Sequence, residues 1–221
     1  MTVKYEERDH LAIITLDRAE ARNAISPAVA SGIEYAIDRY EANDALWAAI
    51  LTGNGSVFCA GADLKEIAAG NLAMLSTEKG DFAGLVKRQR IKPLIAAVNG
   101  PAVAGGFEIV LACDLVVAAT TARFGLPEVK RSLVAAAGGL FRLPRSVGKT
   151  AAMEMILTGD TVDAARAYEL GLVNSVVEPG ALMKEAIALA DRIIANAPLA
   201  VRESRLIAEQ ALTELTTPCG P

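Results

Sequence analysis

The chain has 221 residues, of which 52% are hydrophobic and 22% are charged. This length and composition predict a compact domain with a large core and exclude a disordered chain. The formal net charge of −4 also argues against a general nucleic-acid binder, which would carry a basic excess.

Residue types that bind metals or form disulfides are sparse. Cys59, Cys113 and Cys219 stand far apart and form no Cys-x-x-Cys pair, and His10 is the single histidine. These spacings predict neither a disulfide framework nor a metal site. No uninterrupted apolar run reaches the ~18 to 20 residues of a membrane span, and the N-terminus lacks a signal-peptide pattern. We therefore expect a cytoplasmic protein with no membrane partner.

Strand and helix patterns alternate along the chain. Short apolar runs bounded by turn residues predict buried strands at 11–16, 47–52, 94–98 and 115–119. Helical patterns cover 27–43, 63–70, 106–113, 151–157, 163–170 and 181–197, with further helices from 140 and from 198. Ser26 before Pro27 and an Asp-x-x-Glu box beginning at Asp63 mark two helix starts. This alternation predicts an α/β fold.

The first segment with chemical potential is the Gly-rich turn within residues 51–67. Gly53, Gly55 and Gly61 allow unusual backbone conformations, and small neighbours leave the N–H of Ala62 uncovered at a helix start. Such an N–H group can hold a developing oxyanion. A strand-to-helix turn needs Gly and an N-cap such as Asp63 in any case, so a purely structural role stays open.

A second segment places a carboxylate beside another helix start. Gly105 and Gly106 open a short helix, and Glu108 lies in its first turn among Phe107 and Ile109. Compensation of the helix dipole explains a Glu at this position. Apolar neighbours favour a functional role as well, because burial raises the pKa of a carboxyl toward the range useful for proton transfer.

A second carboxylate, Glu128, follows Pro127 in a predicted turn. Taken alone, Glu128 is best interpreted as a surface acid near Lys130 and Arg131. Together with Glu108 it could divide acid and base roles. Adding water across a C=C bond next to a thioester needs a base, an acid and donors for the enolate oxygen, and the sequence contains candidates for all three.

Six ordered segments resemble the enoyl-CoA hydratase/isomerase (crotonase) family over nearly all of residues 11–197: FCAGADLKEI, AAVNGPAVAGGFEIVLACDL, ARFGLPE, AAAGGLFRLPRSVGK, MEMILTGD and AYELGLVNSVV. The resemblance implies a crotonase-like spiral of ββα units with a helical C-terminal region. Residues 1–195 would form the acyl-CoA-binding core, and 196–221 the remnant of a truncated C-terminal region. It also implies a homotrimer or a hexamer built as a dimer of trimers.

The same resemblance implies an enoyl-CoA hydratase, a lyase that adds water to a 2-enoyl-CoA in syn fashion. The N–H groups of Ala62 and Gly105 would form the oxyanion hole, Glu108 would help activate the water, and Glu128 would protonate C2. No cofactor is implied, because coenzyme A is part of the substrate. The substrate-binding positions implied are Arg22, Ala24, Ala60, Ala62, Asp63, Leu64, Lys65 and Gly105.

Three features keep alternatives open. The loop at 132–136 lacks the family's usual Gly-x-x-Pro and resembles crotonobetainyl-CoA hydratase/racemase-like members, which implies an isomerase, racemase or hydratase of a substituted acyl-CoA. The short C-terminus, ending in TTPCGP, predicts a weaker trimer or a more open site, and allows a non-catalytic acyl-CoA-binding protein. The basic run at 87–92 is predicted as a solvated helix face rather than a contact to CoA phosphates.

Overall fold

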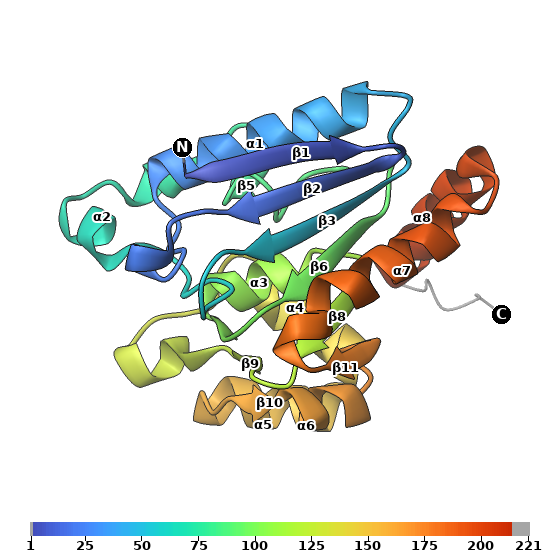
Figure 1. Ribbon diagram of the computed structural model, residues 1–221. Coiled ribbons are helices and arrows are strands. Elements are labelled where there is room, and N and C mark those ends of the chain that lie inside the picture. Colours follow the sequence, from blue (N-terminus) through green and yellow to red (C-terminus); the bar gives the residue numbers. More distant parts are fainter. Residues whose placement is uncertain (1, 214–221) are drawn as a thin grey trace, which may run out of the picture.

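Six strands form the main sheet of the computed structural model, which describes residues 2–213. β1 pairs antiparallel with β2, and every other neighbouring pair is parallel (Figure 1). In spatial order the strands are β1 (Val3–Arg8), β2 (Leu11–Leu16), β3 (Ala48–Gly53), β6 (Leu94–Val98), β8 (Leu115–Ala119) and β11 (Ser175–Val177). The predicted α/β fold is thus confirmed.

Each face of this sheet packs against its own apolar cluster. Alternate residues of a strand point to opposite faces, so Ile14 lies in the cluster that contains helix α1 (Pro27–Ala42), whereas Ile13 lies in the cluster that contains α7 (Leu182–Ile194). Ile33 and Ile37 of α1 and Ala186 of α7 are fully buried. The sheet therefore lies between two apolar clusters, one with α1 and one with α7.

A smaller sheet brings two distant chain segments together. It has the order β10 (Val162–Asp163), β9 (Arg123–Gly125) and β7 (Ala102–Val103), and β7 runs parallel to β9. Helix α3 (Gly105–Leu111) follows β7, and the 3-10 helix η3 (Pro127–Arg131) follows β9. Since parallel neighbours end at the same edge, α3 and η3 begin side by side.

Most predicted elements are confirmed, within a few residues at their ends. Ser26 accepts a hydrogen bond from the N–H of Val29 (3.4 Å), and Asp63 accepts one from Lys65 (2.9 Å). The apolar pattern did not predict β1, because its sequence, VKYEER, is mostly polar and the strand lies at the sheet edge. The remaining elements are η1 (Ala19–Ala21), α2 (Leu64–Ala68), η2 (Leu72–Leu75), β4 (Ser76–Thr77), β5 (Asp81–Phe82), α4 (Gly139–Val147), α5 (Lys149–Thr158), α6 (Ala164–Glu169), η4 (Pro179–Ala181) and α8 (Pro198–Thr213).

No helix within residues 2–213 combines the length and apolar character that crossing a membrane requires.

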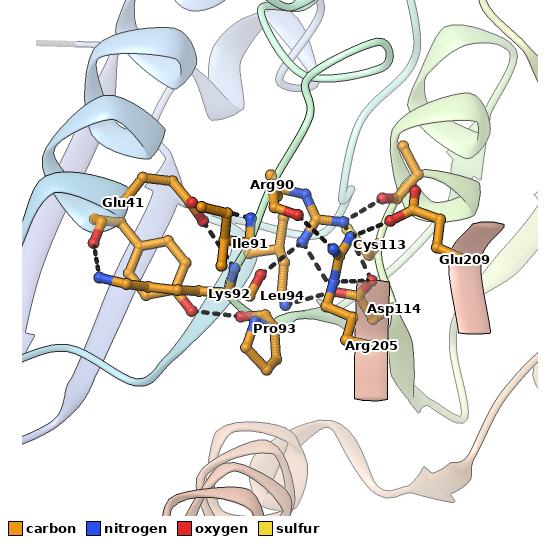
Figure 2. Close-up of polar contacts among 12 residues, drawn as sticks. Glu41, Arg90, Ile91, Lys92, Pro93, Leu94, Cys113, Asp114, Arg205 and Glu209 are labelled. Atoms are coloured by element: carbon orange, nitrogen blue, oxygen red, sulfur yellow. Dashed lines mark hydrogen bonds and ion pairs between the residues drawn. The ribbon is translucent and has the colours of Figure 1, made fainter. Parts of the chain in front are cut away.

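The basic run at 87–92 is not a solvated helix face, so that prediction is wrong. Arg90 and Lys92 are only 3% and 2% exposed. Arg90 donates to Asp114 and to the carbonyl of Ala112, both at 2.8 Å. Lys92 donates to the carbonyl of Tyr40 at 2.9 Å. The two cations satisfy acceptors at the ends of α1 and α3, as Figure 2 shows.

Helix α8 joins the core through the same ionic network. Arg205 donates to Asp114 at 2.8 Å and also to the carbonyl oxygen of Arg90 (Figure 2). Asp114 therefore lies between two arginines whose side chains are 3% and 8% exposed. From 198 to 211, no residue of α8 is buried, so this network provides much of the helix's attachment.

Replacing Asp114 by Asn should lower the free energy of unfolding by about 3 kcal/mol at pH 7, because the nearly buried Arg90 would lose its ion-pair partner and Arg205 would keep only Glu209. Burial alone would raise the pKa of Asp114, but Arg90 and Arg205 lower it below its usual value. The stabilisation is therefore present above about pH 4, the unfolded value, and is lost as pH falls through the lower folded value.

Urea unfolding at pH 7 and pH 3 tests this prediction. Asp160→Asn is the matched control, because Asp160 pairs with Lys130 at 2.5 Å in an exposed position, where ion pairs contribute little. Equal stability of the two variants at pH 7, or a difference that persists unchanged at pH 3, would contradict the assignment.

Candidate active site

The turn at 59–62 is fixed by two neighbouring segments. Cys59 forms a parallel bridge with Ala102 of β7, and Ala62 forms one with Ile25. In the second bridge, Ile25 donates to the carbonyl of Gly61 at 2.8 Å and accepts from the N–H of Asp63 at 2.9 Å. The N–H of Ala62 is left between these bonds, and it donates to no acceptor among the described residues.

A second unused donor lies at the start of α3. Ala104 has a φ of 52°, and its carbonyl accepts from Phe107 at 2.8 Å and from Glu108 at 3.1 Å. The N–H of Gly105 has no acceptor within residues 2–213. A Cβ built on Gly61 would lie 3.0 Å from the Gly105 nitrogen, so the space in front of this donor exists because Gly61 has no side chain. Gly61, with a φ of +89°, adopts a conformation that favours Gly.

Glu108 is buried one turn into α3. It is 3% exposed, and its Oε1 accepts a hydrogen bond from the N–H of Gly139 at 2.9 Å. Burial raises the pKa of Glu108, and the N–H groups of Gly139 and Ala137 and the charge of Arg142 oppose that rise. Glu108 therefore has donors for its charged form despite its burial.

Glu128 has a different environment in η3. Its Oε2 is buried and has no hydrogen-bond partner within residues 2–213. Burial raises its pKa to about 7, with the charge of Glu108 adding to the rise and a bond from its own N–H opposing it. The interpretation of Glu128 as a surface acid beside Lys130 does not hold, because its Oε2 is buried and Lys130 pairs with Asp160 instead. The two carboxyls lie within electrostatic reach of each other.

Most of the implied substrate-binding positions lie in two neighbouring segments, 22–24 and 60–65. The N–H of Ala60 donates to the carbonyl of Arg22 at 3.1 Å, and Arg18 donates to both the carbonyl of Ala24 (3.1 Å) and Asp63 (2.6 Å). Leu64 and Arg22 are exposed, whereas Ala24 and Asp63 are buried. Lys65 is exposed like Leu64. The Asp63 carboxylate is already engaged by Arg18 and by its capping bond.

Sequence reasoning missed three residues of this region. Gly139 donates its N–H to Glu108, and the charge of Arg142 opposes the rise in the pKa of Glu108. The Phe82 ring packs against Gly105 so closely that a Cβ on Gly105 would lie only 2.5 Å from it. The Gly138-Gly139 pair before a helix was a usable signal for the first of these. No group of three or more His, Cys, Asp or Glu side chains within the described chain is arranged to hold a metal ion.

Residues 6–218 match the enoyl-CoA hydratase/isomerase family. The chain belongs to this family. It is 45% identical to a mevalonyl-coenzyme A hydratase of Aspergillus fumigatus over 87% of this chain and 72% of that protein. The structure of an enoyl-CoA hydratase from Mycobacterium marinum is 47% identical, with a TM-score of 0.93 over 97% of this chain and 84% of that one. A carnitinyl-CoA hydratase from Mycobacterium avium is 45% identical, with a TM-score of 0.90 over 94% and 80%.

The family membership and the crotonase-like fold predicted from the sequence are thus confirmed. The two carboxyls with unequal environments follow β7 and β9, and the roles of the two unused N–H groups stay a prediction. Cys219 and the other residues of the TTPCGP ending lie outside the described residues, and the division at 195 stays a prediction.

Proposed function

We propose that the chain is an enoyl-CoA hydratase, a lyase that adds water in syn fashion across the C2–C3 double bond of a 2-enoyl-CoA. The observation that carries this proposal is the pair of carboxyls with unequal environments, Glu108 and Glu128, beside two N–H groups that have no acceptor among the described residues. Relatives named hydratases support it.

In the proposed reaction, the thioester oxygen accepts hydrogen bonds from the N–H groups of Ala62 and Gly105. These donors stabilise the negative charge that develops on the oxygen as water attacks C3. Glu108 takes the proton of the attacking water, and Glu128 gives its proton to C2. The product is a 3-hydroxyacyl-CoA. Glu108 then holds a proton that Glu128 lacks, so one proton must pass between them before the next turnover.

The neighbouring segments 22–24 and 60–65 form the proposed path of coenzyme A. Ala24, Ala60 and Leu64 would line the adenine and pantetheine portions, and Arg22 and Lys65 would approach the phosphates. Both cationic side chains are exposed, as contacts with a highly charged group of the substrate require. We further propose a cytoplasmic protein that acts in fatty acid metabolism, needs no cofactor, and assembles as a trimer or hexamer.

A substrate with a substituted acyl group is the second candidate. Two relatives are named for such acyl groups, mevalonyl and carnitinyl. The loop at 132–136 also leaves Leu133 and Val134 exposed. A hydratase, isomerase or racemase acting on a substituted acyl-CoA therefore uses the same site with a different pocket. The third candidate, a non-catalytic acyl-CoA-binding protein, would bind coenzyme A without turnover.

One experiment separates the three candidates. Crotonyl-CoA, crotonobetainyl-CoA and branched enoyl-CoA substrates are each incubated with the protein, and the products are identified by mass spectrometry. Gain of one water identifies the hydratase, and its preferred acyl group follows from kcat/KM. Unchanged mass with an altered structure identifies an isomerase or racemase. Calorimetric binding of coenzyme A without any product would leave only the binding protein.

The kcat/KM of the hydratase should fall as pH rises above about 7. Glu128 must be protonated to act as the acid, and its pKa is raised to about 7. At low pH, kcat/KM should fall again as Glu108 gains a proton, which gives a bell-shaped profile. Steady-state rates between pH 5 and 9 measure the profile, and a rate that stays constant from pH 7 to 9 would contradict this assignment of the acid.

A further inference from the structure

Arg142 of α4 folds back over the turn that precedes its own helix. Its Nη1 donates to the carbonyl of Ala137 at 3.3 Å, and its Nη2 donates to the carbonyl of Val86. A Cβ built on Gly138 would lie 2.0 Å from Nη1, so the guanidinium covers the turn directly. Arg142 thus joins the 137–139 turn to the segment that follows Phe82.

This turn is the support of Glu108. Gly139 donates its N–H to Glu108 Oε1 at 2.9 Å, and a Cβ on Gly139 would lie 3.1 Å from that oxygen. The close approach means that a small shift of the turn would move or break the bond. A residue that fixes the carbonyl of Ala137 therefore also fixes the donor to Glu108.

Within the described chain, Arg142 is also the cation whose charge affects the pKa of Glu108. Burial raises the pKa of both carboxyls; the charge of Arg142 opposes the rise for Glu108, together with the N–H groups of Gly139 and Ala137, whereas the charge of Glu108 adds to the rise for Glu128. Arg142 in turn faces Glu209 from α8, Arg90 before β6 and Cys113 after α3. Within residues 2–213, no cation acts on Glu128 in this way, so Arg142 favours the charged form of one carboxyl only.

We propose that Arg142 is a positioning residue for the acid/base pair, which holds the 137–139 turn against Glu108 and keeps a positive charge near that carboxyl. Two groups with similar chemistry take opposite roles when their surroundings differ, and here the N–H groups of Gly139 and Ala137 and the guanidinium of Arg142 act on Glu108 but not on Glu128. The kinetic part of this inference rests on the proposed hydratase function, whereas the ionisation of Glu108 can be observed without substrate.

The test compares Arg142→Gln and Arg142→Lys with Arg145→Gln as the matched control. Arg145 lies on the same helix, is exposed, and also contacts the Phe141 ring, at 5.5 Å against 4.9 Å for Arg142. Two readouts are recorded: the pH profile of kcat/KM with crotonyl-CoA, and carbon-13 NMR titration of glutamate carboxyls without substrate. The Glu108 signal is assigned by its loss in Glu108→Gln.

Arg142→Gln should raise the pH at which Glu108 titrates and move the acid limb of kcat/KM the same way, so that kcat/KM at pH 5 falls by roughly three- to tenfold relative to the parent. Arg142→Lys should titrate like the parent but lose kcat, because an ammonium group cannot reproduce the planar two-carbonyl contact. Arg145→Gln should match the parent in both readouts.

Parent-like titration of Glu108 in Arg142→Gln would overturn the proposal. If that variant does not fold, a parent-like kcat in Arg142→Lys would overturn it instead. A purely structural role of Arg142 would lower the yield of folded protein without moving either pH dependence. Absence of turnover in the parent would refute the hydratase function, and the NMR titration would still decide the role of Arg142.

Discussion

Replacing Glu128 by Gln should lower kcat by roughly 10²- to 10⁴-fold, the usual contribution of a positioned general acid. Glutamine keeps the shape of the side chain but has no proton of suitable acidity to give to C2. The N–H groups of Ala62 and Gly105 remain in place, so KM should change little. Steady-state kinetics with crotonyl-CoA measures both constants.

Glu108→Gln should cause a loss of similar size, and the double variant should lose much less than the product of the two single effects, because groups that act as a unit are not additive. Loss of kcat in only one of the two single variants would show that the pair does not share the reaction.

The same Glu128→Gln variant should change the pH dependence of stability. The pKa of Glu128 is raised to about 7 in the folded protein, above an unfolded value of about 4.3. The protonated form therefore stabilises the fold below about pH 4, and this contribution is lost as pH rises through 7. The parent should lose roughly 1 to 3 kcal/mol between pH 5 and 8 from this group, and Glu128→Gln should not.

Gly61→Ala should lower kcat/KM by about 10²- to 10³-fold, the usual effect of losing one oxyanion donor. The added methyl would lie 3.0 Å from the nitrogen of Gly105 and 3.0 Å from the Cβ of Ala104. It would therefore cover the N–H that the thioester oxygen needs. Because the φ of Gly61 is +89°, the substitution should also destabilise the fold.

Gly70→Ala separates these two effects. Gly70 has a φ of +81°, and nothing lies within 4 Å of an added Cβ. Both variants should lose comparable stability in urea unfolding, but only Gly61→Ala should lose activity with crotonyl-CoA. Equal activity of the two variants would show that the space in front of Gly105 is not used by the substrate.

Local patterns were sufficient to predict most of the fold. The apolar runs that became β2 and β6 match the observed bounds, because strands buried on both faces have continuous apolar sequences. The burial of Glu108 also followed from its apolar neighbours. The interpretation of 87–92 failed because its cations meet acceptors on α1 and α3, segments distant in the sequence.

The environment of Glu128 could not be predicted for a similar reason. Its burial depends on the parallel pairing of β7 with β9, which no local pattern encodes. The roles of Gly139 and Arg142 likewise depend on how α4 packs beside α3. Family resemblance supplied the link between Glu108 and Glu128, and the structure supplies the physical difference between them.

Product analysis in labelled water tests the acid/base pair most directly. The protein is incubated with crotonyl-CoA in deuterium oxide that also contains oxygen-18, and the product is analysed by mass spectrometry and NMR. We predict 3-hydroxybutyryl-CoA with oxygen-18 at C3 and a single deuterium at C2, formed by the parent and greatly slowed in Glu108→Gln and Glu128→Gln. Absence of this product, or its formation at the parent rate in both variants, would contradict the proposed hydratase.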